Sequence, residues 1–352
     1  FAMAIATLAG FFRTQNVKPG TVGVICIDSL FDLWLVLLAL RSCGVVTLAA
    51  RTPEIAGDHR LGPDGYVITT QAQPKPTASA LAQRNGWREI IVPISLPTQT
   101  KRTLTGPDNP EGGHLLLTSG TTGKYKAIYR PPESHGARET RHTKALGIGK
   151  KSWQYLGAMG PWTGGAYGRA LTVWMQGGAC VFEQRAGRVA DFLKLPVTDA
   201  KLTVADMGEL LSKLPPRAPR RDDLRIQIVG GAAPWVLVEQ IRARITKRIY
   251  NNLSSTEAST IASSHLEKPG DQYWYSIYPE RTVEVVDDND QPVSAGTIGR
   301  LRIKMLKDDR PIYWGDEDAS KEFFKDDFWY SGDLALFGPD GRLSLQGRST
   351  DV

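Results

Sequence analysis

The sequence predicts an α/β protein: two packed α/β layers with largely parallel sheets, followed by a smaller β-rich subdomain. Three observations support this prediction. The first 100 residues alternate between helical and extended hydrophobic patterns, as βαβ units do. The alternation resumes from about residue 146 to residue 280. After Tyr278 it gives way to short alternating stretches separated by turns, which is typical of antiparallel β structure.

The first layer is predicted from apolar runs separated by turn residues such as Pro19-Gly20. Helices are expected over Ala2–Phe12 and Leu30–Ser42, and strands over Thr21–Ile27, Val45–Ala49, Tyr66–Thr70, Glu89–Pro93 and Leu115–Leu117.

The second layer and the β-rich part follow from the same patterns. Strands are expected over Ala179–Glu183, Leu202–Ala205, Leu224–Val229 and Arg248–Tyr250, and helices over Val189–Lys194, Gly208–Lys213 and Val236–Arg244. The β-rich part contains Arg281–Asp287, the turn Asp288-Asn289-Asp290, Gly299–Met305, the turn Asp340-Gly341 and Arg342–Gln346. We therefore expect paired α/β subdomains over residues 1–280 and a β-rich subdomain over residues 281–352.

Charge and composition exclude several classes of protein. The chain has 352 residues, and its 43 Lys plus Arg against 37 Asp plus Glu give a net charge of +6. The cations are interspersed with acids rather than gathered in a block, so a solvated surface is favoured over a nucleic-acid-binding arm. Three cysteines without C-x-x-C spacing, and five histidines without an H-x-x-x-H pair, argue against a disulfide framework or a His/Cys metal site.

Three features of the sequence predict the cellular location of the protein. The odd cysteine count favours a reducing compartment. The longest apolar run, Leu33–Leu40, is far shorter than the roughly 20 residues that span a bilayer. The segment from Ala2 to Arg13 lacks the pattern of a signal peptide. We expect a cytoplasmic protein without a membrane span.

One stretch carries the strongest chemical signal, an apolar strand running into a loop of hydroxyls, glycines and lysines from Leu115 to Lys126. Glycines allow backbone N–H groups to converge on an anion, and the hydroxyl and ammonium groups add donors, so the loop suits polyphosphate. It is not a Walker A loop, because Thr118 stands five residues before Gly123 and Tyr125 follows Lys124. The alternative is a polar turn without a ligand.

The loop resembles the phosphate loop of the adenylate-forming superfamily, T-S-G-T-T-G-x-P-K-G, found in acyl-CoA synthetases, nonribosomal peptide adenylation domains and firefly luciferase. Tyr125 replaces the usual Pro and Ala127 the usual Gly. The resemblance implies that Lys126 is catalytic and that the ATP phosphates contact Thr118, Ser119, Gly120, Thr121, Thr122, Gly123 and Lys124. It also implies that the β-rich subdomain is a distorted barrel.

Four further motifs follow in the family's order. The stretch Val229-Gly230-Gly231-Ala232-Ala233-Pro234 resembles the segment that packs against adenine. Leu253-Ser254-Ser255-Thr256-Glu257 resembles Y-G-x-T-E, in which Thr256 would contact the α-phosphate and Glu257 would hold Mg²⁺, both as catalytic residues. Leu253 replaces the aromatic residue that stacks on adenine, and Ser254 replaces Gly.

The last two motifs lie in the β-rich part. Tyr330-Ser331-Gly332-Asp333-Leu334 resembles Y-x-T-G-D-L, which implies that Asp333 binds the ribose hydroxyls. Gly347-Arg348-Ser349-Thr350-Asp351 resembles the hinge motif G-R-x-x-D, with Arg348 reaching ribose or phosphate and Asp351 as the pivot. Each residue alone has a structural alternative, such as a turn, a helix start or a surface cation. Five motifs in the family's order make coincidence a poor explanation.

The resemblance implies an AMP-forming acid–thiol ligase (an acyl-CoA synthetase). ATP and Mg²⁺ would convert a carboxylic acid to an acyl-adenylate with release of pyrophosphate, and CoA would accept the acyl group. Two alternatives remain: a stand-alone adenylation enzyme that loads the phosphopantetheine thiol of a carrier protein, and a non-catalytic nucleotide-binding relative. A nucleic-acid binder is the weakest option. A homodimer is one expected oligomeric state, and the family's small C-terminal lid domain, with its lysine, is expected beyond Val352.

The acid is indicated only broadly. The segment Gly160–Gly168 corresponds to the family's F-D-x-S region but has no acidic residue, which disfavours an α-amino acid, and no histidine. An acyl pocket is expected around Trp162, Tyr167, Gly231 and Trp235. The aromatic side chains there favour an aryl or fatty acid. The alternative is that they are ordinary core residues.

Overall fold

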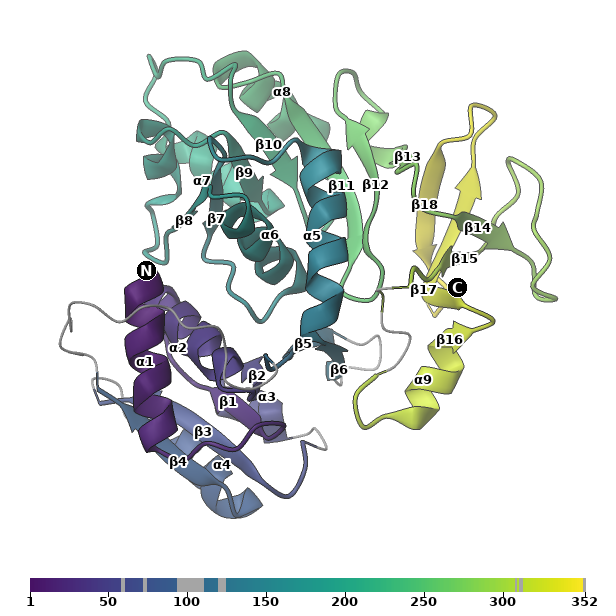
Figure 1. Ribbon diagram of the computed structural model, residues 1–352. Helices are drawn as coiled ribbons and strands as arrows, with labels where there is room; N and C mark the ends of the chain where they lie inside the picture. The colour runs from purple at the N-terminus through teal and green to yellow at the C-terminus, as the bar shows by residue number, and fades with distance from the viewer. Residues whose placement is uncertain are drawn as a thin grey trace. The chain divides into compact units, whose positions relative to one another are not determined.

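The computed structural model describes residues 1–57, 61–71, 75–93, 111–119, 125–307, 309 and 313–350. Figure 1 shows these residues as helices and sheets. The chain divides into two compact units. Unit 1 comprises Phe1–Gly136, Gly160–Gly164 and Ile312–Glu317, and unit 2 comprises Ala137–Met159, Gly165–Pro311 and Asp318–Val352.

Unit 1 is built on sheet A, whose strand order is β4-β3-β1-β2-β5-β6. Its strands are β1 (Val22–Ile25), β2 (Val46–Ala49), β3 (Gly65–Thr70), β4 (Arg88–Val92), β5 (His114–Ser119) and β6 (Tyr125–Arg130), and its helices are α1 (Ala2–Thr14), α2 (Leu30–Ser42), α3 (Pro53–Gly57) and α4 (Pro76–Asn85). Neighbouring strands are parallel except β5 and β6. The largely parallel first layer is confirmed.

Helix α2 shows why the hydrophobic pattern of the sequence predicts the helices of this layer. The Ser29 side chain accepts a hydrogen bond from Asp32 N at the helix start, which satisfies a backbone donor that the helix itself cannot pair. The apolar residues that follow are almost all buried. Cap and burial together begin and end the helix at the predicted residues.

Unit 2 contains sheet B, whose strand order is β13-β12-β11-β10-β9-β7-β8. The strands are β7 (Trp153–Gly157), β8 (Ala179–Phe182), β9 (Asp199–Leu202), β10 (Arg225–Ile228), β11 (Ile249–Ser255), β12 (Ser259–His265) and β13 (Ser276–Ile277). Helices α5 (Pro132–Leu146), α6 (Gly164–Met175), α7 (Val204–Lys213) and α8 (Trp235–Arg244) accompany it, with 3₁₀ helices η1 (Val189–Lys194) and η2 (Asp271–Tyr273). Strands β8, β7, β9, β10 and β11 are parallel, and β12 and β13 are antiparallel.

The two faces of sheet B differ in chemistry. One face forms an apolar core with residues of α7, α8 and η1. The other face lies under α6, because Arg169 on that helix donates hydrogen bonds to Gln154 on β7 and Gln227 on β10 (Figure 1). A helix therefore covers each face, as parallel sheets require.

Two predicted elements of unit 2 need correction. The strand predicted over Leu202–Ala205 is wrong, because β9 ends at Leu202 and Thr203 caps α7 in a capping box with Asp206. The helix over Val189–Lys194 is present as a 3₁₀ helix rather than an α-helix.

Sheet C forms the β-rich part of unit 2. Its strands are β14 (Val283–Val286), β15 (Gly299–Lys304), β16 (Phe324–Lys325), β17 (Phe328–Phe337) and β18 (Leu343–Arg348), and helix α9 (Glu317–Phe323) precedes β16. All pairs are antiparallel. One hydrophobic core joins sheet C to β12, and an antiparallel bridge joins Tyr275 to Leu343. The expected β-rich segment is confirmed, while the domain boundary at residues 280/281 stays a prediction.

Candidate functional site

Strands β10 and β11 are parallel neighbours, and both run toward the same edge of sheet B; the last residue of β10, Ile228, pairs with Asn251, and β11 continues to Ser255. Ligands of open α/β sheets bind at this edge. The loop after β10 places Gly230 at φ +85° and Gly231 at φ +149°, conformations that side chains disfavour. A Cβ on either glycine would have no neighbouring atom within 4 Å among the described residues. The backbone of this loop is therefore open to a ligand.

The rest of the loop has a different role. Ala232 is exposed, whereas Ala233 is buried in the core against α7 and α8. Pro234 is the N-cap residue of α8. Of the segment predicted to pack against adenine, the two glycines and Ala232 face outward, and Ala233 anchors the loop.

The end of β11 contains the second motif. A register shift occurs between Leu253 and Ser254, where β11 pairs with β12. Leu253 packs against the core shared by β12 and sheet C. Ser254 is exposed, and Ser255 Oγ accepts a hydrogen bond from Ala258 N at 2.8 Å, which shapes the turn that contains Thr256.

Glu257 lies in this turn and is buried, with a relative exposure of 6%. The turn is tied down by Arg281, whose guanidinium donates hydrogen bonds to Ala258 O and to Thr260 O. Arg281 also pairs with Asp309, Nη1 to Oδ2 at 2.7 Å, and both side chains are buried. The sequence reasoning missed this pair, since nothing in the local pattern distinguishes Arg281 from a surface cation.

The described residues fit a magnesium ion that is held by one carboxylate together with a nucleotide. No group of three or more His, Cys, Asp or Glu side chains gathers among them. Mg²⁺ bound with nucleotides takes one or two carboxylates together with phosphate oxygens and water. A single buried carboxylate such as Glu257 suits that arrangement.

Asp333 and Arg348 are brought together by the antiparallel pairing of β17 and β18, which places them opposite each other. Arg348 Nη1 also donates to Ser331 O at 2.9 Å, and Asp333 N donates to Ser331 Oγ at 3.1 Å. Burial raises the pKa of Asp333, while the Arg348 charge lowers it. Asp351, the predicted hinge, lies outside the described residues.

In unit 1, β5 and β6 flank the predicted phosphate loop as an antiparallel pair, with Thr118 opposite Lys126 and Ser119 opposite Tyr125. Gly120, Thr121, Thr122, Gly123 and Lys124 lie outside the described residues. The Lys126 ammonium lies 5.0 Å from the centre of the Tyr313 ring. Tyr125 takes part in the ladder that a Pro at this position would weaken.

The predicted aromatic pocket residues lie on different elements. Arg51 stacks over the Trp162 ring at 5.5 Å in unit 1. In unit 2, Tyr167 is buried on α6, on the polar face of sheet B. Trp235 packs against the core on the α7–α8 face. Tyr167 and Trp235 therefore belong to elements on opposite faces of the sheet.

His114 in unit 1 is a buried residue that the site prediction did not use. Its Nδ1 lies 2.8 Å from Thr47 Oγ1 and its Nε2 2.9 Å from Pro161 O. Burial lowers the pKa of His114 to about 3, so the ring is neutral. It holds the carbonyl that precedes Trp162.

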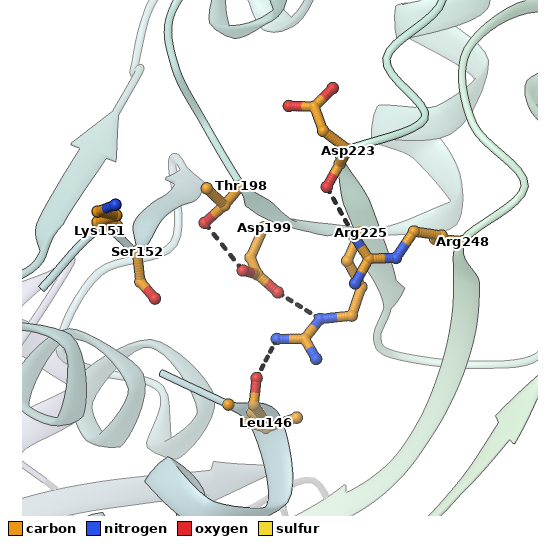
Figure 2. Close-up of a pocket in the computed structure, with 9 residues that line it drawn as sticks. Leu146, Lys151, Ser152, Thr198, Asp199, Asp223, Arg225 and Arg248 are labelled. Atoms are coloured by element: carbon orange, nitrogen blue, oxygen red, sulfur yellow. Dashed lines mark hydrogen bonds and ion pairs between the residues drawn. The ribbon is translucent and has the colours of Figure 1, made fainter. Parts of the chain in front are cut away.

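A pocket of about 480 Å³ lies in unit 2, lined at the amino ends of β9 and β10 by Asp199 and Arg225 (Figure 2). Arg225 pairs with Asp199 and donates to Leu146 O at 2.5 Å, and Arg248 donates to Asp223 O at 2.8 Å. Arg225 and Asp199 compensate each other, and the pocket is at the opposite edge of the sheet from Gly230.

A membrane span is not found among the described helices, since none combines the required length with sufficient hydrophobicity.

Comparison with known proteins adds family information to this geometry. The model of the family described as "AMP-binding enzyme" matches residues 1–305. A salicylyl-CoA synthase / salicylate adenylyltransferase of a Streptomyces species is 25% identical over 75% of this chain and 50% of the relative. Enterobactin synthase component E of Escherichia coli (strain K12) is 22% identical over 99% of this chain and 70% of the relative. The chain thus spans about half the length of the salicylyl-CoA synthase.

Solved structures show the same fold. The O-succinylbenzoate coenzyme A synthetase of Bacillus subtilis, in complex with AMP, superposes with a TM-score of 0.81 at 18% identity, over 99% of this chain and 91% of that one. The amide bond synthetase of Marinactinospora thermotolerans gives a TM-score of 0.80 at 19% identity, over 98% and 73%.

Proposed function

Because the chain belongs to the AMP-binding enzyme family, we propose that it activates a carboxylic acid with ATP. The acid's carboxylate oxygen attacks the α-phosphorus, the bond from that phosphorus to the bridging β-oxygen breaks, and pyrophosphate leaves. The observation that carries this proposal is the carboxyl edge of sheet B. Exposed glycine backbone follows β10, and a hydroxyl-lined turn with a buried carboxylate follows the neighbouring β11.

The reaction needs charge neutralisation and positioning more than a general base. Thr256 would contact the α-phosphate, and Lys124 and Lys126 would screen the outer phosphates. Glu257 would hold Mg²⁺, which supplies positive charge to the phosphate oxygens. Asp333 would accept hydrogen bonds from the ribose hydroxyls, with Arg348 fixing its carboxylate.

We propose an aryl or fatty acid as substrate and the CoA thiol as acceptor. The lack of an acidic residue in Gly160–Gly168 and the buried Tyr167 on α6 support this choice over an α-amino acid. By their names, one relative acts on salicylate, an aryl acid, and another forms acyl-coenzyme A. The three cysteines are free thiols, which supports a cytoplasmic location.

Loading of a carrier protein is the second candidate. Its support is the similarity to nonribosomal peptide synthetases, such as one from Penicillium brevicompactum that is 25% identical over 97% of this chain and 15% of its own length. Thioester formation with CoA or with a carrier protein distinguishes the two acceptors.

ATP–pyrophosphate exchange with a panel of aryl, fatty and amino acids tests the proposal. We expect exchange with one class of acid, and subsequent thioester formation with CoA but not with a carrier protein. If no acid supported exchange while ATP still bound, the result would support the non-catalytic alternative. The two departures from the family motifs, Leu253 packed into a core and Tyr125 in place of Pro, would then fit that alternative.

A further inference from the structure

The polar face of sheet B holds a cluster of buried donors that neither the motifs nor the proposed reaction uses. Lys201 on β9 and Gln227 on β10 are paired in register, so their side chains lie on the same face of the sheet, under α6. Both residues are at least nine-tenths buried. Each stands next to the last residue of its strand, at the carboxyl edge that carries the Gly230–Gly231 loop.

Lys201 has unused hydrogen-bonding capacity. Its Nζ donates to Gly165 O at 2.8 Å in the first turn of α6. An ammonium has three donors, so two have no partner among the described residues. A Cβ built on Gly165 would approach only this Nζ, at 3.1 Å, among described atoms outside its own turn. A side chain there would crowd the ammonium, so Gly165 allows Lys201 to reach the carbonyl.

Gln227 offers a second unused donor. Its Oε1 accepts from Arg169 Nη2 and from Asn252 Nδ2, both at 3.0 Å. These two bonds fix the orientation of the amide, and its Nε2 is buried without a partner among the described residues. A buried donor left unpaired costs about 1–3 kcal/mol, so native proteins rarely keep one without a ligand or water.

The cluster also contains two basic side chains that form no ion pair with a described carboxylate. Arg169 donates hydrogen bonds from Nη1 to Gln154 Oε1 at 2.9 Å and from Nη2 to Gln227 Oε1, and both acceptors are neutral. No described carboxylate pairs with Lys201 or Arg169, since the nearest along β9, Asp199, pairs with Arg225 and accepts from Thr198. Burial and the Arg169 charge hold the pKa of Lys201 well below its usual range, which an anion beside it would reverse.

We propose that Lys201 and Gln227 bind a second carboxylate of the substrate, so that the activated acid is a dicarboxylic acid. One carboxylate reacts at the α-phosphorus beyond the end of β11, and the other accepts hydrogen bonds from Lys201 Nζ and Gln227 Nε2. Asn252, which bonds to Gln227, directly precedes the Leu253–Glu257 motif, so donors and motif share one edge of the sheet. This inference rests on the proposed acid activation and narrows its substrate class.

Matched substrates test the inference on the unmodified chain. Aliphatic and aryl diacids, such as glutarate and isophthalate, are compared in ATP–pyrophosphate exchange with their monomethyl esters, which lose one charge and add only a methyl group. We expect kcat/KM to be about 10- to 100-fold higher for the preferred diacid, the range expected of a hydrogen bond to a charged group. Equal or better use of half-esters or plain monoacids would overturn the inference and leave acid activation standing. If none of the acids tested supported exchange, both this inference and the proposed acid activation would be overturned.

Two variants locate the effect. Lys201→Met keeps the length of the side chain and removes its charge, and Lys213→Met, an exposed lysine on α7, is the matched control. We expect Lys201→Met to abolish the preference for the diacid while half-ester exchange remains. Gln227→Glu places a carboxylate beside Lys201, and we expect it to raise Tm and remove the diacid preference.

The second variant also covers the case in which Lys201→Met fails to fold. A purely structural network would gain Tm from Gln227→Glu without any change in the ratio of diacid to half-ester. A preference that survives Gln227→Glu would therefore contradict the assignment.

Discussion

Arg348 and Asp333 face each other across β17 and β18, with Nε of Arg348 3.1 Å from Oδ1 of Asp333. The two motifs predict a separate contact with the nucleotide for each residue. The ladder makes them one unit, because the arginine charge partly offsets the burial that raises the pKa of the carboxyl group. The arginine therefore favours the ionised form of Asp333, against the larger effect of burial.

Removal of that charge is expected to change the pH dependence of nucleotide binding. Asp333 binds as a carboxylate, so affinity is present above its pKa and falls as pH drops through it. Arg348→Ala should raise the pKa of Asp333 further and shift this loss to higher pH, whereas Arg348→Lys should shift it less. Calorimetric AMP titrations at several pH values measure the effect. Superimposable pH profiles for the native chain and Arg348→Ala would contradict the coupling.

Glu257→Gln is expected to weaken the magnesium dependence of the reaction. The amide keeps the buried shape but loses the negative charge that a hard divalent cation prefers. We expect the Mg²⁺ concentration for half-maximal exchange to rise about tenfold or more, as for a lost charged interaction of about 1.4 kcal/mol. Glu267→Gln, at an exposed position in the same unit, is the control. An unchanged magnesium titration would remove Glu257 from the site.

Lys126→Met is expected to lower kcat for exchange by about 10- to 100-fold, since it removes one charge from the phosphate site. Its stem stays beside Tyr313, so the circular dichroism spectrum and Tm should change little. Lys18→Met, an exposed lysine of unit 1, serves as the control. Full activity in Lys126→Met would show that the lysine only packs against the ring.

The Arg281–Asp309 pair is expected to stabilise unit 2, because each buried charge is compensated by the other. Removal of one partner takes the counter-charge from the other, which is buried, and this costs up to about 3–5 kcal/mol. Arg281→Met should therefore lower the free energy of unfolding by that amount in urea titrations. The double variant with Asp309→Asn should cost less than the sum of the two single changes. Strict additivity would mean that the two side chains do not interact.

Because His114 is buried, we expect unit 1 to lose stability as the pH falls. Its pKa is lowered by burial from 6.5 to about 3, so below pH 6.5 the unfolded chain takes up a proton that the folded chain refuses. The contribution is therefore present above pH 6.5 and lost as pH falls towards 3, with a slope of at most about 1.4 kcal/mol per pH unit. His114→Gln should flatten the unfolding free energy between pH 6 and pH 4, whereas the exposed His265→Gln should not. An unchanged slope in His114→Gln would assign the acid sensitivity to other groups.

Local signals were sufficient where the cause of a structure is local. Helix α2 was predicted to the residue because a cap and an unbroken apolar run determine it. The strand expected over Leu202–Ala205 failed for a reason that is also local: the capping box of Thr203 and Asp206 begins a helix within a short apolar stretch. Motifs such as Gly230–Gly231 were found because their spacing is itself the signal.

By itself, the sequence determined the α/β class, the order of the layers and the motif residues, since hydrophobic period and motif spacing act over a few neighbouring positions. Only the tertiary structure decided which distant residues meet. Arg281 reaches Asp309, His114 reaches Pro161, and Gln227 pairs with Lys201 in register. Such contacts depend on strand pairing and on which face of a strand is buried. A lysine or glutamine inside a four-residue strand carries no local mark of that burial.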